Sequence, residues 1–273
     1  MGLAPSQGLA VTPRRAYLAG VGSIIARAFA AVAALTAGSV HALELAYEPV
    51  ALGWSTDEVE SASLGNLTAI VQRAERANAL GCERHCERLQ RVFERLVAVA
   101  RTQGARAAAL PWMLTVVRLL DVEAMAMPGG QVIVSEAFVE RRAPHDEALA
   151  FVLAHELAHS LLEHERQALT FARLLLPRDV PRTVSDMYVE IDYNFALLQA
   201  MEPVLQQGEL EADELGLLLA SVAGYSPLRH LAFIEAEAAS DAGRRPLVST
   251  HPRAQVRLER LRSLLPLALR LLP

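Results

Sequence analysis

The sequence predicts an α+β fold that is mainly helical, with a small β-sheet or hairpin. Apolar residues make up 52% of the 273 residues and charged residues 21%, so the chain can bury a substantial core in one large domain. Apolar residues recur at helical spacing over most of the chain, whereas β-rich runs are confined to two short stretches. The fold class follows from this distribution.

The helical periodicity is divided into segments by proline, glycine and polar runs. In chain order, the expected elements are helices at 67–80 and 83–100, strands at 112–120 and 131–134, and helices at 146–174, 182–202, 207–223, 228–240 and 253–264. Residues 43–64 lack periodicity, so packing is expected to begin after them. Pro128, Gly129 and Gly130 are typical of a turn between the strands.

The first 42 residues predict export. They contain no acidic residue and run apolar from Ala28 to Ala37, before small residues at Val40 and Ala42, which is typical of a cleavable signal peptide. The expected location is therefore periplasmic or otherwise exported. A retained membrane anchor is the first alternative, and a mitochondrial presequence, rich in arginine and poor in acids, is the second.

Charge and cysteine content exclude several classes of protein. The formal net charge of −5 argues against a nucleic-acid binder, which normally carries a basic patch. The two cysteines, Cys82 and Cys86, are too few for a disulfide scaffold or a multi-cysteine zinc module. They lie one helical turn apart and lack other soft ligands, so a strained local disulfide or free thiols are favoured over a second metal site.

A short motif in the helix at 146–174 predicts a metal site. His155 and His159 are separated by four residues, so their imidazoles share one helix face and can point at one ion. Two neutral imidazoles make half of a tetrahedral zinc site. Glu156 lies about a third of a turn from His155, where it suits a general base better than a ligand.

Such a site needs a third protein ligand. One class of zinc peptidases has a glycine and a further histidine after the motif, but those positions are Leu162 and Glu165 here, which excludes that class. His164 lies about 140° round the helix from His159, so it is interpreted as a surface histidine. Another source must therefore supply the ligand.

The acidic run at 209–213 offers a better candidate. Glu209 and Asp213 are four residues apart on an expected helix, so Glu209 can coordinate zinc while Asp213 accepts a hydrogen bond from a ligand imidazole. Glu211 points elsewhere on that helix and is interpreted as a solvated acid, as is Glu163.

Further motifs follow in a fixed order. They are HELAH at 155–159, ELEAD at 209–213 with Gly216, GYSP at 224–227, and STHP at 249–252 with Arg257. In this order, over residues 80–262, the chain resembles peptidase family M48. That family contains the CaaX prenyl protease, the HtpX-like membrane proteases, a related mitochondrial inner-membrane protease, and periplasmic enzymes tied to outer-membrane protein assembly.

The resemblance implies a zincin-type metalloprotease domain of the gluzincin kind, with the small sheet beside the motif helix. It implies that one zinc ion is bound by His155, His159 and Glu209, with Glu156 as the catalytic base. The domain organisation expected from it is a signal peptide at 1–42, an N-terminal extension at 43–78, the zinc metallopeptidase domain at 79–264, and an apolar tail at 265–273.

The same resemblance assigns a substrate-binding edge. Residues 123–130 are similar to a strand and turn beside the family's active-site cleft, where a substrate can add as a strand. The candidate residues for this edge are Met127, Pro128, Gly129 and Gly130. The sequence departs from the family at Glu123 and Met125, which concerns subsite preference rather than chemistry.

His251 and Arg257 are further candidates. The resemblance implies that His251 approaches the metal and blocks its open coordination position, as a histidine here does in some periplasmic relatives. Its alternatives are a donor that stabilises the transition-state oxyanion and a plain loop histidine before Pro252. Arg257 can supply an oxyanion donor or brace the motif helix.

These observations predict a zinc-dependent endopeptidase that acts on polypeptides, among them misfolded or envelope proteins, with Glu156 as general base. The rival is a non-catalytic, chaperone-like module in which zinc is structural; the intact Glu156 argues against it. No nucleic-acid partner is expected. The apolar tail at 265–273 is too short to span a membrane but can lie against a membrane surface or an envelope protein.

Overall fold

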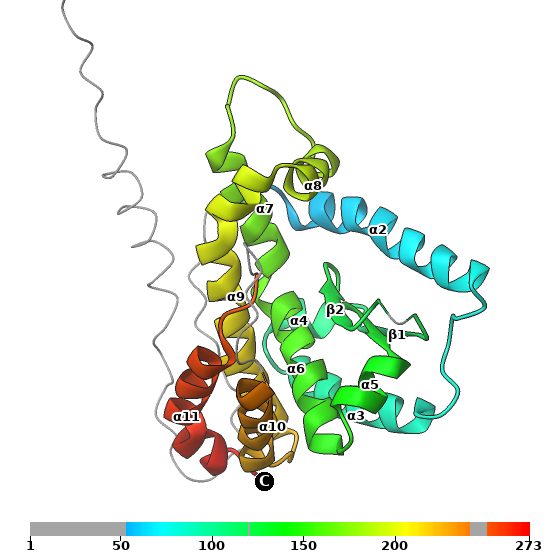
Figure 1. Ribbon diagram of the computed structural model, residues 1–273, viewed down its shortest axis with the longest axis vertical. Helices are drawn as coiled ribbons and strands as arrows, with labels where there is room; N and C mark the ends of the chain where they lie inside the picture. The colour runs from blue at the N-terminus through cyan, green and yellow to red at the C-terminus, as the bar shows by residue number, and fades with distance from the viewer. Residues whose placement is uncertain (1–52, 120, 241–249) are drawn as a thin grey trace, which may run out of the picture. The chain divides into compact units, whose positions relative to one another are not determined.

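A computed structural model describes residues 53–119, 121–240 and 250–273 (Figure 1). In chain order its elements are α2 (Thr56–Arg76), α3 (Cys86–Ala100), α4 (Ala105–Ala109), β1 (Met113–Val117), β2 (Ala124–Met127), β3 (Gln131–Ser135), α5 (Glu136–Arg142), α6 (Asp146–Leu162), α7 (His164–Leu175), α8 (Val184–Tyr193), α9 (Phe195–Val222), α10 (Pro227–Ser240) and α11 (Ala254–Arg270). The mainly helical α+β class is confirmed. The predicted signal peptide at 1–42 and its alternatives lie outside the described residues.

Helices α6 and α9 form the centre of the fold. Every residue of α6 from Ala148 to Ala158 is buried, which is typical of a helix inside a core. In α9 every residue from Glu211 to Ser221 is buried. The two helices pack on each other more extensively than any other pair of described elements, and α3, α7, α10 and the sheet pack around α6 and α9 (Figure 1).

Gly216 permits this close packing. A Cβ atom at Gly216 would lie 3.0 Å from the backbone nitrogen of His155 and 3.1 Å from its Cα. Backbone atoms inside a helix cannot turn aside as the end of a flexible side chain can. The glycine therefore lets α9 approach α6 at the residue that begins the HELAH motif.

The sheet has three strands in the order β1-β3-β2, with β1 parallel and β2 antiparallel to the central strand β3. Residues 128–130 close the β2–β3 hairpin. Gly129 and Gly130 have φ values of 85° and 78°, which only glycine adopts without strain. The predicted small sheet is confirmed, and β2 is an outer strand that packs against α6.

The first described helix begins earlier than predicted. A capping box starts α2 at Thr56: the Ser55 hydroxyl accepts from the amide of Glu58 (3.2 Å), and the Glu58 carboxylate accepts from the amide of Ser55 (2.8 Å). Such a box satisfies amides that a helix start leaves without partners. The expectation that packing begins only after residue 64 is wrong, because the cap, rather than apolar periodicity, sets this start.

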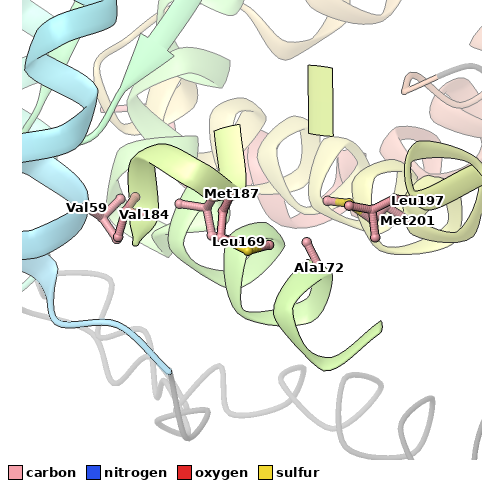
Figure 2. Close-up of a cluster of buried hydrophobic side chains, with 7 residues drawn as sticks. All are labelled: Val59, Leu169, Ala172, Val184, Met187, Leu197 and Met201. Atoms are coloured by element: carbon pink, nitrogen blue, oxygen red, sulfur yellow. The ribbon is translucent and has the colours of Figure 1, made fainter. Parts of the chain in front are cut away.

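A second cluster of buried side chains joins α2 to α7, α8 and the first half of α9 (Figure 2). Its members are aliphatic residues or methionine: Val59, Leu169, Ala172, Val184, Met187, Leu197 and Met201. Val59 lies one turn after the cap of α2. The helix in the predicted N-terminal extension is thus held against the helices that follow the metal motif.

The predicted continuous helix at 146–174 is broken at Glu163. This residue has φ 55° and ψ 37°, the left-handed conformation that is uncommon outside glycine. Side chains hold the break: Arg106 donates to the carbonyl of Ser160 (3.2 Å), and the Glu163 carboxylate accepts from Arg166 (3.0 Å). Glu163 is paired and largely buried, so its interpretation as a solvated acid is wrong.

Two other predicted boundaries differ. The expected helices at 182–202 and 207–223 are divided at Asn194 instead, whose side chain caps α9, and α9 continues through Pro203. Helix α11 continues to Arg270, so the predicted apolar tail is largely helical. Among the described residues, no helix combines the length and apolar character needed to cross a bilayer.

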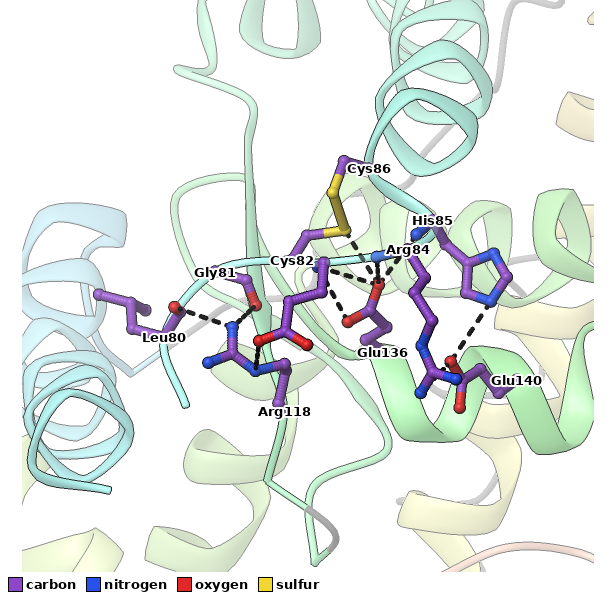
Figure 3. The surroundings of a disulfide bond; sticks show 10 residues. Leu80, Gly81, Cys82, Arg84, His85, Cys86, Arg118, Glu136 and Glu140 are labelled. Atoms are coloured by element: carbon purple, nitrogen blue, oxygen red, sulfur yellow. Dashed lines mark hydrogen bonds and ion pairs between the residues drawn. A yellow bond between two sulfur atoms is a disulfide. The ribbon is translucent and has the colours of Figure 1, made fainter. Parts of the chain in front are cut away.

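Cys82 and Cys86 form a local disulfide, one of the two states that the sequence favours (Figure 3). The buried carboxylate of Glu136 holds the loop between them. It accepts hydrogen bonds from three backbone amides, those of Glu83 (3.0 Å), Arg84 (2.6 Å) and His85 (2.9 Å). Burial alone would raise the pKa of Glu136, but the hydrogen bonds from these amides have the larger effect, and the pKa lies below its ordinary value. Glu136 directly follows β3, so the disulfide loop is tied to the end of the sheet.

His230 of α10 is a buried neutral histidine behind the motif helix. Its ring meets Phe151 edge-on at 3.9 Å between centroids, and neither ring nitrogen has a hydrogen-bond partner among the described residues. Burial lowers the pKa of His230 to about 3. The ring therefore stays neutral in the folded protein where an exposed histidine would be charged.

Acid is expected to destabilise the protein through His230. Below its ordinary pKa of about 6.5, the unfolded chain binds a proton that the folded chain does not, so stability falls as pH falls from there towards about 3. His230→Phe keeps an aromatic ring but cannot bind this proton. As pH falls, the unfolding free energy of the variant should therefore decrease less steeply than that of the wild type, by about 1.4 kcal/mol per pH unit. Urea denaturation between pH 5 and 7 measures both slopes; equal slopes would contradict the assignment.

Candidate metal centre

Helix α6 presents His155 and His159 side by side at its buried end. Their Nε2 atoms are 3.0 Å apart, as expected for residues one turn apart on a common face. His155 is buried, and His159 is partly buried. The predicted pair of imidazoles therefore converges on one point.

Glu209 of α9 supplies the third side chain. Its Oε2 atom lies 3.4 Å from His155 Nε2, and its Oε1 atom lies 3.5 Å from His159 Nε2. In a tetrahedral zinc site with bonds of about 2.0–2.1 Å, neighbouring ligand atoms are about 3.3 Å apart. The triangle of 3.0, 3.4 and 3.5 Å, and its two nitrogens and one carboxylate, fit zinc.

Asp213 and Arg257 stand behind His155. Asp213 is fully buried, and its Oδ1 atom accepts from His155 Nδ1 at 3.0 Å. Arg257 donates to both oxygens of Asp213, at 2.6 and 2.7 Å. Burial raises the pKa of Asp213, but the two hydrogen-bonded partners outweigh it and hold this pKa well below its ordinary value. This geometry supports the bracing role among the alternatives for Arg257.

Glu156 lies beside the triangle rather than in it. Its carboxylate is buried and accepts a hydrogen bond from the backbone amide of Ala126 in the outer strand β2. Burial raises the pKa of Glu156 to about 7, and the negative charge of Glu209 adds to the effect against the opposing charge of His155. A carboxylate with this pKa can both take and return a proton near neutral pH.

The histidines of the site differ in charge. Burial lowers the pKa of His155, but Asp213 and Glu209 outweigh burial and raise it to about 10. Burial and the charge of His155 lower the pKa of His159 well below its ordinary value. One imidazole is thus protonated and its neighbour neutral. Because a metal requires both to be unprotonated, metal binding competes with this proton.

His251 lies next to the triangle, with its Nε2 atom 3.2 Å from Glu209 Oε2. Its side chain is exposed, unlike those of the triangle, and its Nδ1 atom lies 3.0 Å from the hydroxyl of Thr250. Residues 241–249, which precede this pair, are not among the described residues. The position next to Glu209 agrees with the near-metal alternative for His251.

The candidate substrate-edge residues lie at the turn that follows β2. Met127 is the last residue of β2 and is buried, and Pro128, Gly129 and Gly130 form the turn. The residue of β2 that reaches the site is Ala126, through its amide to Glu156. Ala126 was not among the predicted site residues, since a backbone donor leaves no signal in side-chain chemistry.

Two interpretations of single residues are wrong. His164, expected at the surface, is buried, and its Nδ1 atom lies 2.9 Å from His159 Nδ1. Glu211, expected to be solvated, is also buried, with Oε2 3.2 Å from His164 Nε2. The left-handed Glu163 explains both, because it ends α6 and turns His164 back towards α9.

Comparisons with known proteins agree with this geometry. The family model described as peptidase family M48 matches residues 83–265. The chain is 30% identical over 185 residues to the mitochondrial metalloendopeptidase OMA1 of Schizosaccharomyces pombe, covering 65% of this chain and 52% of that protein. It is 32% identical over 155 residues to OMA1 of Saccharomyces cerevisiae, covering 53% and 44%.

The similarity extends to animals. The chain is 28% identical over 179 residues to the mitochondrial metalloendopeptidase OMA1 of Bos taurus, covering 59% of this chain and 34% of that protein. The chain thus spans about half, or less, of the length of these curated relatives. The range matched by the family model, residues 83–265, includes the two histidines and the α9 carboxylates.

Proposed function

The chain belongs to peptidase family M48, and from this membership and the geometry of its site we propose that it is a zinc-dependent endopeptidase. The observation that carries the proposal is the triangle of His155, His159 and Glu209 with the carboxylate of Glu156 beside it. These three side chains would hold the zinc ion. Glu156 would be the general base.

The mechanism assigns a role to each buried group. Zinc, when bound, supplies Lewis-acid chemistry: it lowers the pKa of water towards about 7 and polarises a peptide carbonyl. Glu156 would take a proton from the attacking water and return it to the leaving amine. Asp213 and Arg257 keep the His155 ring oriented during these steps.

The substrate is proposed to be an extended polypeptide. Strand β2 is an outer strand of the sheet and lies next to Glu156, so a peptide added alongside it would bring a scissile bond towards the base. Met127 at the end of β2 and the turn of Pro128, Gly129 and Gly130 would border this peptide. Misfolded or envelope proteins, which offer extended segments, are the proposed natural substrates.

The test of this function is whether the chain cleaves an unfolded protein and whether a zinc chelator abolishes that cleavage. The purified chain is expected to digest casein, to lose the activity in the presence of a zinc chelator, and to regain it when zinc is restored, because the proposed chemistry depends on the ion. Peptide release, followed with time, measures the rate. A chain that binds casein but releases no chelator-sensitive peptides would instead be the chaperone-like module.

The proposed location is outside the cytosol. The local disulfide suits an oxidising compartment, which supports a place outside the cytosol. The relatives are named as mitochondrial, which gives no support to a periplasmic location and favours the mitochondrial alternative. The predicted signal peptide and membrane anchor remain predictions about residues outside the described part of the chain.

A further inference from the structure

The imidazole of His159 has a second contact, on the side away from the candidate metal centre. Its Nε2 atom faces His155 and Glu209, whereas its Nδ1 atom lies 2.9 Å from His164 Nδ1. If Nε2 is the ligand atom, the neutral ring carries its proton on Nδ1. His159 must then donate this proton to His164.

The same reasoning sets the proton of His164. Because its Nδ1 atom accepts from His159, its own proton must be on Nε2, which lies 3.2 Å from Glu211 Oε2. The other oxygen of Glu211 accepts from the side-chain amide of Gln207 at 2.8 Å. If Nε2 of His159 binds the metal, the donor and acceptor of each following hydrogen bond are therefore fixed, from His159 through His164 to the carboxylate of Glu211.

Burial makes these contacts consequential. Only 9% of His164 and 7% of Glu211 is exposed, so water cannot easily replace either partner. A Cβ atom at Gly208 would lie 3.5 Å from His164 Cγ, so the backbone of α9 passes directly over the ring. The ring is thus confined between α9 and the start of α7.

We propose that His164 and Glu211 are positioning residues that hold His159 in its zinc-binding tautomer and orientation, an inference that rests on the zinc-dependent function proposed above. Asp213 does the same for His155 through a direct contact. Helix α9 thus supplies one ligand, Glu209, and a carboxylate for each ligand imidazole, with His164 bridging the longer gap. Partners of this kind typically contribute about 10–100-fold to metal affinity.

We call the hydrogen-bonded series His159, His164 and Glu211 the relay. The affinity of the full chain for zinc, measured by competition with a chelator of known affinity, tests it. His164→Phe keeps a ring of similar size but accepts no hydrogen bond, and it is expected to weaken zinc binding about 10–100-fold. His164→Asn is smaller but returns an acceptor close to the position of Nδ1, and it is expected to recover part of the loss. A purely structural role would give the opposite order, because phenylalanine fills the space better.

Glu165→Gln is the matched control. Glu165 lies on the same helix and is partly buried, but it interacts with Tyr188 rather than with His159, His164 or Glu211, so zinc affinity should stay within about twofold of the wild type. Should His164→Phe not fold, the comparison of Glu211→Leu with Glu165→Gln decides, with the relay requiring weaker zinc binding in Glu211→Leu.

Two results distinguish failure of the relay from failure of the proposed zinc peptidase function. Wild-type zinc affinity in His164→Phe, or tighter binding in His164→Phe than in His164→Asn, overturns the relay and leaves the zinc peptidase proposal intact. A wild-type chain that binds no zinc overturns the proposed function, and the relay with it.

Discussion

Replacing Glu156 by glutamine is expected to leave zinc bound while removing nearly all peptidase activity. Glutamine keeps the size of the side chain but cannot take a proton, and a positioned general base typically contributes about 10²–10⁴-fold to the rate. Glu156 lies outside the ligand triangle, so the metal should not depend on it. Zinc content and the rate of casein digestion, measured on the same preparation, give both results.

His155→Ala is the contrasting variant. It removes a corner of the triangle and leaves Asp213 without the imidazole that it contacts, so zinc as well as activity should be lost. A wild-type rate in Glu156→Gln would exclude Glu156 as the base. Loss of zinc in Glu156→Gln would instead make this carboxylate part of the metal site.

Gly216→Val is expected to destabilise the protein and to weaken the metal site together. The first added carbon would lie 3.0 Å from the backbone nitrogen of His155, and valine adds two more. Overpacking of this kind costs about 1–3 kcal/mol, and here the obstacle is helix backbone, which cannot rotate away. Because α9 carries Glu209 and α6 carries both histidines, any separation of the helices opens the triangle. Urea denaturation and zinc affinity measure the two effects.

Gly65→Val provides the control for this substitution. Gly65 also lies inside a helix, α2, but it is exposed, and a Cβ atom there would meet nothing within 4 Å. The change in unfolding free energy should therefore stay within about 0.5 kcal/mol. If the two variants were equally stable, close approach at Gly216 would not be what limits the packing of α6 on α9.

Much of the candidate site was predictable because its parts are local. The spacing of His155 and His159, and that of Glu209 and Asp213, places each pair on one helix face in any helix. The residues that separate the strands, Pro128-Gly129-Gly130, likewise predicted a turn from their own conformational preferences. Each of these predictions depends only on the spacing or the conformational preferences of a few residues within one element.

The helix boundaries were predicted wrongly where side-chain hydrogen bonds, rather than apolar periodicity, set the backbone conformation. Periodicity extended one helix through Glu163, whose left-handed conformation depends on Arg106 and Arg166, and so His164 was expected to face solvent. The start of α2 was missed because the capping box at Ser55 and Glu58 outweighs weak apolar periodicity. In both cases a few side-chain hydrogen bonds decided the backbone.

By itself, the sequence determined the mainly helical fold class, the pair of histidines, and the acidic helix residues that can join them, because each depends on spacing within one helix. Only the tertiary structure decided which carboxylate serves which imidazole, that Arg257 contacts Asp213, and that His164 and Glu211 are buried behind His159. The contacts of Arg257 with Asp213 and of His164 with Glu211 join helices far apart in the chain, whereas His159 and His164 lie on the consecutive helices α6 and α7. Their distances depend on how closely the backbones approach, which at Gly216 is set by the absence of a side chain.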